Sequence, residues 1–144
     1  MLRSFLTFSR NMSRSEQEWR AILSPQQFKV LRQSGTEAPF SGEYVSTPAG
    51  PGIYECVACH QPLYKGSTKF SAHCGWPAFY EAIPGSLKTI EDRSLGMVRT
   101  EMRCSKCDSH LGHIFKGEGY NTPTDERHCV NSICLKYKPE EKSD

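Results

Sequence analysis

Two Cys-x-x-Cys pairs constrain the fold of this chain more than any other feature of its sequence. Cys56 and Cys59 form the first pair, and Cys104 and Cys107 form the second. Two residues between two thiolates make a tight turn that lets both sulfurs reach one ion, and four thiolates match the tetrahedral preference of zinc. A redox-active dithiol is the alternative for either pair alone, but two pairs in one short chain favour a metal site. The sequence therefore predicts a Zn²⁺ ion that joins two distant segments of one domain.

A second set of ligands for the same ion overlaps the first. Cys104, Cys107, His110 and His113 recur at every third residue, and imidazole also binds zinc. This set would leave the first Cys-x-x-Cys pair without a role, so the four cysteines are the preferred ligands. The two histidines are then free to act elsewhere.

Length and charge indicate one globular domain. The 144 residues suffice for a single domain with its own core, and no apolar run is long enough to span a bilayer. Of the 18 Lys+Arg, three lie in residues 1–14, which leaves 15 against 16 Asp+Glu. Because nucleic-acid binding needs clustered basic surface, we expect neither nucleic acid nor a membrane as a partner. The domain is expected to cover residues 15–138, followed by a polar tail over 139–144.

The first 14 residues differ from the rest in composition. They contain three arginines, several serines and no acid, and Leu2, Phe5 and Leu6 can share one helical face. Such an Arg- and Ser-rich, acid-poor start is typical of a mitochondrial transit peptide. A basic disordered tail is the alternative. Initiation at Met12 would give a shorter cytosolic form.

Helical signals are confined to the start of the domain. A capping-box pattern at Ser15 and Glu18 begins the first predicted helix, and Pro25 ends it. The second helix is expected to begin after Ser24 and to stop by Gly35.

From residue 52 onward, short runs of β-branched and aromatic residues alternate with turns. This pattern is typical of antiparallel sheet, so the domain is expected to be mainly β. The expected strands lie within residues 52–59, 61–64, 94–104, 110–115 and 127–137.

Three cysteines remain after the zinc ligands are assigned, and Cys129 has the most polar neighbours. Side chains alternate between the two faces of a strand, so Arg127, Cys129 and Asn131 are expected to project to the same side. A guanidinium beside a thiol favours the thiolate, which is the nucleophilic form. A buried structural cysteine is the alternative.

The other two cysteines differ in setting. Cys74 lies in a turn with glycine and proline, beside the apolar surface of Trp76. A thiol in a loop is suited to attack an oxidised partner; packing against a core tryptophan is the alternative. Cys134 follows Cys129 by five positions, which on one strand places the two about 16 Å apart, beyond disulfide reach. Cys134 is therefore expected to be structural.

The motifs CGWPAF, HLGH and RHCVNS, together with the two Cys-x-x-Cys pairs, resemble those of the methionine-R-sulfoxide reductases. The resemblance extends into LSPQQFKVLRQSGTEAPFSGEY and covers the chain from about Trp19 to Leu135. It implies a small, mainly β domain of two antiparallel sheets with short N-terminal helices. It also implies that the zinc is structural and is held by the four Cys-x-x-Cys cysteines.

The resemblance further implies a reaction and a role for each remaining residue. Cys129 would attack the sulfoxide sulfur, release methionine and become a sulfenic acid. Cys74 would then form a disulfide with it, which thioredoxin or a similar dithiol would reduce. The substrate would be methionine-R-sulfoxide, protein-bound or free, and a monomer is expected. The implied substrate-binding residues are Trp76, His110, His113, Arg127 and Asn131.

Two positions depart from the family's pattern, and one spacing requires a bend. His73 precedes Cys74 where the family often has a small residue, which could alter the pKa of the thiol. Gly117 stands where the family often has an acid, with Glu118 next. The three-residue spacing in HLGH cannot place both histidines on one face of a regular strand, so we expect a bend there.

A non-catalytic zinc module that binds protein partners is the competing interpretation. It would need the four zinc ligands alone. Cys74, Trp76 and Cys129 would have no function in such a module, so these three residues discriminate between the two interpretations.

Overall fold

The computed structural model describes residues 14–140. Almost all of the predicted transit peptide and most of the polar tail lie outside the described residues, so both stay predictions. Within residues 14–140, no helix is long and apolar enough to cross a membrane.

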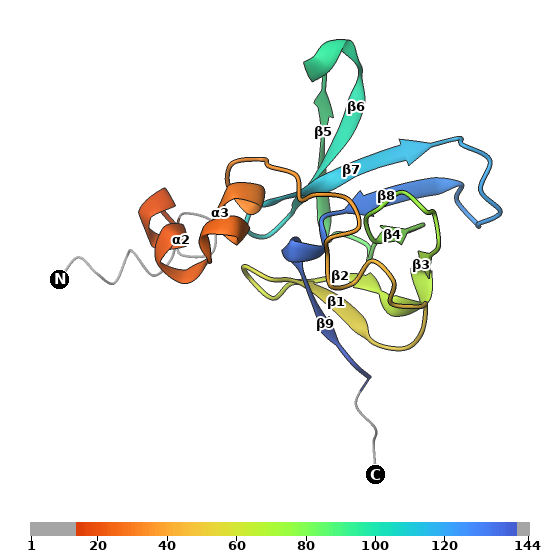
Figure 1. Ribbon diagram of the computed structural model, residues 1–144, viewed down its shortest axis with the longest axis horizontal. Helices are drawn as coiled ribbons and strands as arrows, with labels where there is room; N and C mark the ends of the chain where they lie inside the picture. Colours follow the sequence, from red (N-terminus) through yellow and green to blue (C-terminus); the bar gives the residue numbers. More distant parts are fainter. Residues whose placement is uncertain (1–13, 141–144) are drawn as a thin grey trace.

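The described chain consists of short elements joined by long loops (Figure 1). In order, the elements are α2 (Glu16–Ile22), α3 (Pro25–Leu31), β1 (Ile53–Cys56), β2 (Pro62–Lys65), η1 (Gly66–Thr68), β3 (Lys69–Phe70), β4 (Ala78–Phe79), β5 (Leu87–Asp92), η2 (Ser94–Gly96), β6 (Arg99–Cys104), β7 (His110–Lys116), β8 (Glu126–Val130), η3 (Ser132–Cys134) and β9 (Leu135–Lys138), where η marks a single 3₁₀ turn.

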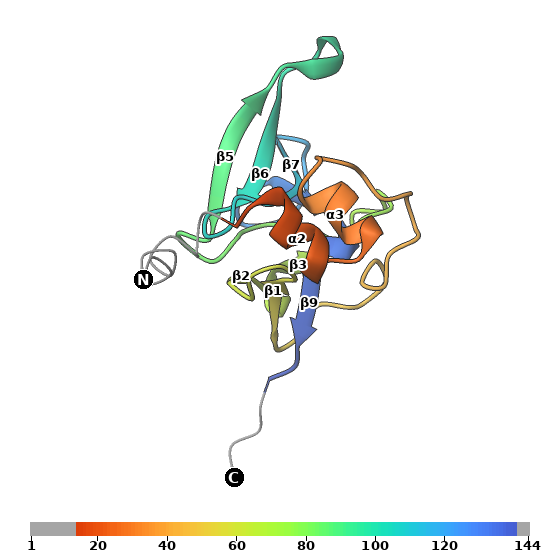
Figure 2. The same cartoon turned by 90° about the vertical axis from the view of Figure 1, so that its left-hand side faces the viewer.

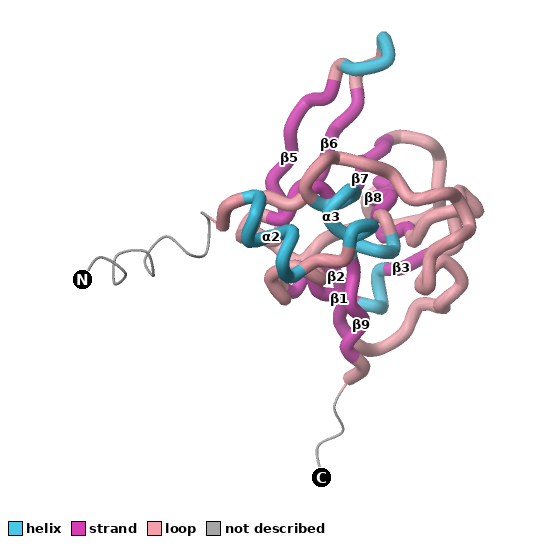
Figure 3. The backbone as a smooth tube through the Cα atoms, turned by 60° about the vertical axis from the view of Figure 1, so that its left-hand side comes forward, coloured by secondary structure: helices cyan, strands magenta, loops and turns pink. Residues whose placement is uncertain are grey.

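The two predicted helices are confirmed together with their caps. Ser15 and Ser24 each accept a bond from the backbone N–H three residues on, and the side chains of Glu18 and Gln27 return the bond. α3 ends before the predicted stop at Gly35. Beyond it, residues 32–52 form one long loop to β1 without helix or strand (Figure 3), which we call the α3–β1 loop.

The strands form two antiparallel sheets, as expected. The smaller sheet has the order β2-β1-β9, and the larger has the order β3-β4-β8-β7-β6-β5. β5 and β6 form a hairpin that projects beyond the rest of the domain (Figure 2). β8 lies between β4 and β7 in the larger sheet, so its side chains are held by neighbours on both edges.

The prediction of one continuous strand over residues 127–137 is wrong. The chain leaves the larger sheet after Val130, turns through η3 and enters the smaller sheet as β9. Cys129 and Cys134 therefore belong to different elements, and the separation derived from one strand does not apply. Cys134 is fully buried, and its Sγ lies 3.3 Å from the carbonyl oxygen of His110, which fits its expected structural role.

Two further differences concern the projecting hairpin. The strand expected within residues 94–104 begins at Arg99, because residues 94–96 form the η2 turn at the hairpin tip. β5 was not predicted at all. It is the edge strand of its sheet and none of its residues is fully buried, so it lacks the apolar alternation by which strands are recognised.

Candidate active site and metal centre

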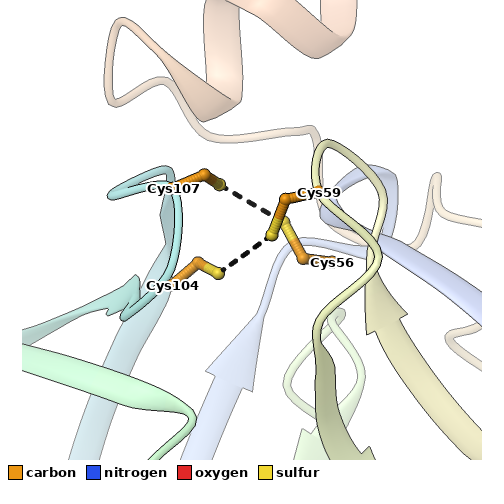
Figure 4. A group of neighbouring side chains, drawn as sticks. All are labelled: Cys56, Cys59, Cys104 and Cys107. Carbon is orange, nitrogen blue, oxygen red and sulfur yellow. Dashed lines mark hydrogen bonds between the residues drawn. The ribbon is translucent and has the colours of Figure 1, made fainter. Parts of the chain in front are cut away.

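The four Cys-x-x-Cys sulfurs converge on one point (Figure 4). All four Sγ atoms lie within 4.8 Å of one another. Cys59 and Cys104 approach to 3.5 Å, and Cys56 and Cys107 to 3.7 Å. Sulfurs placed tetrahedrally about 2.3 Å from a zinc ion would be about 3.8 Å apart. The predicted convergence is confirmed, and the donor set fits a tetrahedral metal ion.

Matching turns hold the two pairs. The N–H of His60 donates to the carbonyl of Cys56 at 2.7 Å, and the N–H of Asp108 donates to that of Cys104 at 2.8 Å. Both turn residues adopt the left-handed conformation, with φ of 67° and 65°. Gln61 Nε2 also donates to the Cys104 sulfur at 3.4 Å. A donor at a sulfur, such as that of Gln61, stabilises thiolate charge and orients the metal ligand.

The histidines of HLGH are directed away from this centre, each to a carboxylate. His110 Nδ1 lies 2.7 Å from Glu101 Oε2, and His113 Nε2 lies 2.9 Å from Asp92 Oδ2. The alternative metal site built from these histidines is therefore not formed. The expected bend is a β-bulge at Leu111, where the pairing of β6 with β7 shifts by one residue. The bulge brings both imidazoles to the same side, with ring centroids 5.7 Å apart.

The two redox candidates, Cys74 and Cys129, lie side by side. Their sulfurs are 3.5 Å apart although one comes from the loop before β4 and the other from β8. A disulfide needs a separation of about 2.05 Å, so a small side-chain movement would join them. The structure thus brings together the pair that the resemblance implied.

Ionisation of this pair is shared between the two sulfurs. The hydrogen bond with Cys129 lowers the pKa of Cys74 to about 5, and the same bond together with burial raises the pKa of Cys129. The charge of Arg127 lowers the pKa of both thiols. One thiolate and one thiol are therefore favoured near neutral pH, with a single proton between them.

The sheet places His113 directly opposite Cys129. The two residues are register partners of β7 and β8, and Gly112 faces Val130 beside them. A side chain at Gly112 would clash with the carbonyl oxygen of Cys129. Glycine at this position therefore allows β7 to approach β8 closely enough to bring the imidazole to the thiol.

A cavity of about 340 Å³ lies over the two thiols. It contains every predicted site residue outside the metal centre except His110, together with two residues that the sequence did not indicate, Thr36 and Phe115. Trp76 and Phe115 give it apolar surface. Its lining residues are Thr36, Cys74, Trp76, His113, Phe115, Arg127, Cys129 and Asn131.

His110 is not among the residues that line the cavity. Its side chain is buried, and its ring packs edge-on against that of His113. Direct contact of His110 with substrate, which the resemblance implies, stays a prediction. In the structure His110 contacts His113, which itself lines the cavity.

The β5–β6 hairpin supplies the acid that holds His113. Hydrogen bonds from Ser94 and from His113 keep the pKa of Asp92 well below its usual range, so its carboxylate is ionised. Arg99 lies 3.2 Å from the same carboxylate. An ionised partner fixes which ring nitrogen of a histidine carries a proton. Asp92 thereby sets the orientation of an imidazole that faces Cys129.

Arg127 is held beside the cavity by Glu118. Its Nε and Nη2 atoms donate to the two carboxylate oxygens at 2.8 and 3.0 Å, and its guanidinium lies 4.2 Å from the centroid of the Phe115 ring. Two parallel bonds to a carboxylate fix a guanidinium in both position and plane. Glu118, the residue after Gly117, is thus the acid that holds the guanidinium.

His73, the other departure from the pattern, lies exposed on the loop that carries Cys74. It adopts φ of 56°, in the left-handed region. Non-glycine residues adopt that conformation at a cost.

Comparison with known proteins places these features in one family. Residues 23–139 match the family described as the SelR domain. Peptide methionine sulfoxide reductase B3 of Arabidopsis thaliana is 57% identical over 129 residues, which cover 90% of this chain and 72% of that protein. Peptide methionine sulfoxide reductase B5 of the same plant is 54% identical over 132 residues, which cover 92% and 93%. Among solved structures, the Yippee-like domain of Mis18 matches with a TM-score of 0.51 at 16% identity, over 65% of this chain and all of that one, which is a likeness of fold alone.

Proposed function

Because the chain belongs to the SelR-domain family of methionine sulfoxide reductases, we propose that it reduces the R epimer of methionine sulfoxide through Cys129 and Cys74. The family membership gives the reaction, which is the reduction of methionine sulfoxide. The observation that supports the assignment of residues is the 3.5 Å contact between the two sulfurs in the wall of a partly apolar cavity.

Cys129 is the better placed nucleophile of the two thiols. It lies on a strand held from both edges, opposite His113, whereas Cys74 lies in a loop. Arg127, the residue two positions before it, projects into the same cavity and stabilises a thiolate there. An attacking atom on a central strand and a second thiol on a loop suit a nucleophile and a resolving cysteine respectively.

The first half of the cycle transfers oxygen from substrate to enzyme. The proton shared by the pair passes from Cys129 to Cys74, whose sulfur lies 3.5 Å away. The Cys129 thiolate then attacks the sulfoxide sulfur, and the oxygen must gain a proton before methionine can leave. His113 faces Cys129 and its Nε2 is bonded to Asp92, so in its imidazolium form it would donate this proton from Nδ1. Methionine is released in reduced form, and Cys129 retains the oxygen as a sulfenic acid.

The second half returns the enzyme to its starting state. The Cys74 thiolate attacks the sulfenic sulfur, the oxygen leaves as water, and a Cys74–Cys129 disulfide forms. Thioredoxin or a similar dithiol then reduces this disulfide. The enzyme thus needs two external thiols for each methionine that it releases.

Trp76 and Phe115 shape the cavity for the substrate. Their rings line it together with the carboxamide of Asn131. We propose that the Trp76 ring contacts the methyl group of the sulfoxide, since an apolar group gains from burial against an aromatic face. Asn131 then orients the polar part of the substrate.

We propose Zn²⁺ as the ion of the metal centre, held by Cys56, Cys59, Cys104 and Cys107. Four thiolates are the donor set of structural zinc, which adds folding free energy and leaves no open coordination position for a substrate. None of the four ligands lines the cavity. The ion is therefore assigned to stability and not to turnover.

Cys74→Ser is expected to separate the two halves of the cycle. Dithiothreitol reduces the Cys129 sulfenic acid directly, so turnover with dithiothreitol should stay within about threefold of the wild type. Thioredoxin needs a disulfide to attack, so turnover with thioredoxin should fall by about twentyfold or more. Initial rates with each reductant measure this difference. Cys134→Ser, which removes a buried thiol outside the cavity, is the control and should behave as the wild type. Full thioredoxin activity in Cys74→Ser would contradict the resolving role.

A further inference from the structure

The backbone of Glu37 bonds to two residues that line the cavity, and its carboxylate bonds to the η3 turn. Glu37 lies in the α3–β1 loop and is not itself a lining residue. We infer that Glu37 is a positioning residue, which sets the orientation of Asn131 and Trp76 for the reaction. The inference rests on the proposed role of the cavity as the substrate site.

The backbone of Glu37 reaches two residues that line the cavity. Its N–H donates to Oδ1 of Asn131 at 2.9 Å, and its carbonyl accepts from the indole Nε1 of Trp76 at 3.1 Å. Asn131 and Trp76 come from segments more than fifty residues apart in the sequence. One peptide segment of the α3–β1 loop therefore connects the two.

The side chain of Glu37 fixes that peptide segment in place. Oε2 accepts the backbone N–H of Ser132 at 2.7 Å, and Oε1 accepts that of Ile133 at 2.9 Å. These N–H groups begin the η3 turn, where backbone donors have no partner within the turn. A carboxylate that accepts two backbone N–H groups makes strong, charge-assisted bonds. The loop is thus attached to the corner at which the chain leaves β8.

The contact with Glu37 decides which way the Asn131 carboxamide faces. Nδ2 of Asn131 donates to the carbonyl of Leu111 at 3.0 Å, and Oδ1 accepts from Glu37. A flipped amide would set two donors against each other at Glu37 and two acceptors at Leu111. The amide is therefore held in one orientation, which leaves the second Nδ2 hydrogen to bond a substrate.

The carboxylate is needed for this arrangement, although it lies away from the cavity. Without it, the N–H groups of Ser132 and Ile133 lose their acceptors, and an unsatisfied buried donor is costly. Relaxation of the α3–β1 loop would relieve that cost and would move the Glu37 backbone away from Asn131 and Trp76. A misplacement of about 1 Å in a substrate-orienting group can lower a rate by about a hundredfold.

The α3–β1 loop has other anchors that should keep such variants folded. The N–H of Tyr44 donates to Oγ of Ser132 at 2.8 Å, and the Tyr44 ring packs edge-on against Tyr54 with centroids 5.4 Å apart. The N–H of Phe40 also bonds the carbonyl of Gly75 at 2.7 Å. Loss of the Glu37 carboxylate should therefore disturb the cavity more than the fold.

The test compares Glu37→Ala and Glu37→Gln with a matched control, Glu43→Gln, on the same loop. Glu43 is exposed. We expect kcat/KM for methionine-R-sulfoxide with dithiothreitol to fall about thirtyfold in Glu37→Ala and less in Glu37→Gln, which keeps one acceptor. Glu43→Gln should stay within twofold of the wild type. Alkylation of Cys129 by iodoacetamide does not use the orienting groups, so its rate should stay within about threefold in every variant.

A second readout reports on Trp76 itself. Its indole N–H resonance, identified by its loss in Trp76→Phe, should shift in Glu37→Gln and stay in place in Glu43→Gln, because the hydrogen bond to the Glu37 carbonyl changes in the first variant alone. Should Glu37→Ala fail to fold, Glu37→Gln carries both measurements.

Two results would overturn the inference. One is a folded Glu37 variant with wild-type kcat/KM and an unmoved indole resonance. The other is an equal fall in turnover and in Cys129 alkylation, which would mean that Glu37 acts on the fold as a whole. An inactive wild-type protein would instead count against the proposed function, so the two failures are distinguishable.

Discussion

Cys129→Ser is expected to lower kcat/KM for methionine-R-sulfoxide by at least about a thousandfold, whichever reductant is supplied. A serine hydroxyl is almost entirely protonated at neutral pH and is a far weaker nucleophile than a thiolate beside Arg127. Serine also lacks the sulfur needed for a disulfide with Cys74. In the native pair the two sulfurs lie 3.5 Å apart. Initial rates of methionine formation, with dithiothreitol and then with thioredoxin, measure the loss.

The control for this variant is Cys134→Ser. Cys134 is more deeply buried than Cys129 and contacts the carbonyl of His110, a bond that a serine hydroxyl can also donate. Its activity should stay within about threefold of the wild type, since Cys134 does not line the cavity. If Cys129→Ser kept a tenth or more of wild-type activity with dithiothreitol, Cys129 could not be the nucleophile.

Cys107→Ser is expected to lower the melting temperature by more than about 10 °C. The turn with Cys56 and Cys59 follows β1 of the smaller sheet, and the turn with Cys104 and Cys107 joins β6 to β7 of the larger. An ion held by all four therefore ties the two sheets together. Zinc binding of this kind contributes about 10–16 kcal/mol to folding in small zinc domains, so loss of one ligand removes a large share of the stability.

Thermal unfolding followed by circular dichroism, with metal content from elemental analysis, tests this expectation. The wild type should contain one zinc per chain and Cys107→Ser much less. Cys74→Ser removes a half-buried thiol from outside the centre and should change the melting temperature by no more than about 2 °C. A melting temperature for Cys107→Ser equal to that of the wild type would contradict a structural metal.

Features set by neighbouring residues could be predicted from the sequence. The capping box of Ser15 with Glu18 and the helix start at Ser24 depend on residues within one helical turn, and both are confirmed. Strand alternation placed Arg127, Cys129 and Asn131 toward one side, and all three line the cavity. The spacing in HLGH required an irregularity, which is the bulge at Leu111.

Features set by distant contacts could not be predicted in this way. Asp92 reaches His113 from an edge strand with no apolar alternation, and Glu118 reaches Arg127 across the turn between β7 and β8. The turn after Val130 is bonded by Glu37, whose carboxylate accepts the N–H groups of η3 nearly a hundred residues away. No local pattern distinguishes such an acid from one on a solvated surface.

The central claim is that this chain reduces one epimer of methionine sulfoxide, and a stereochemical assay tests it most directly. The protein is mixed with dithiothreitol and, in separate reactions, with the resolved R and S epimers of a methionine sulfoxide substrate. We expect the R epimer to be converted to methionine and the S epimer to remain. Consumption of the S epimer, or of neither, would contradict the claim.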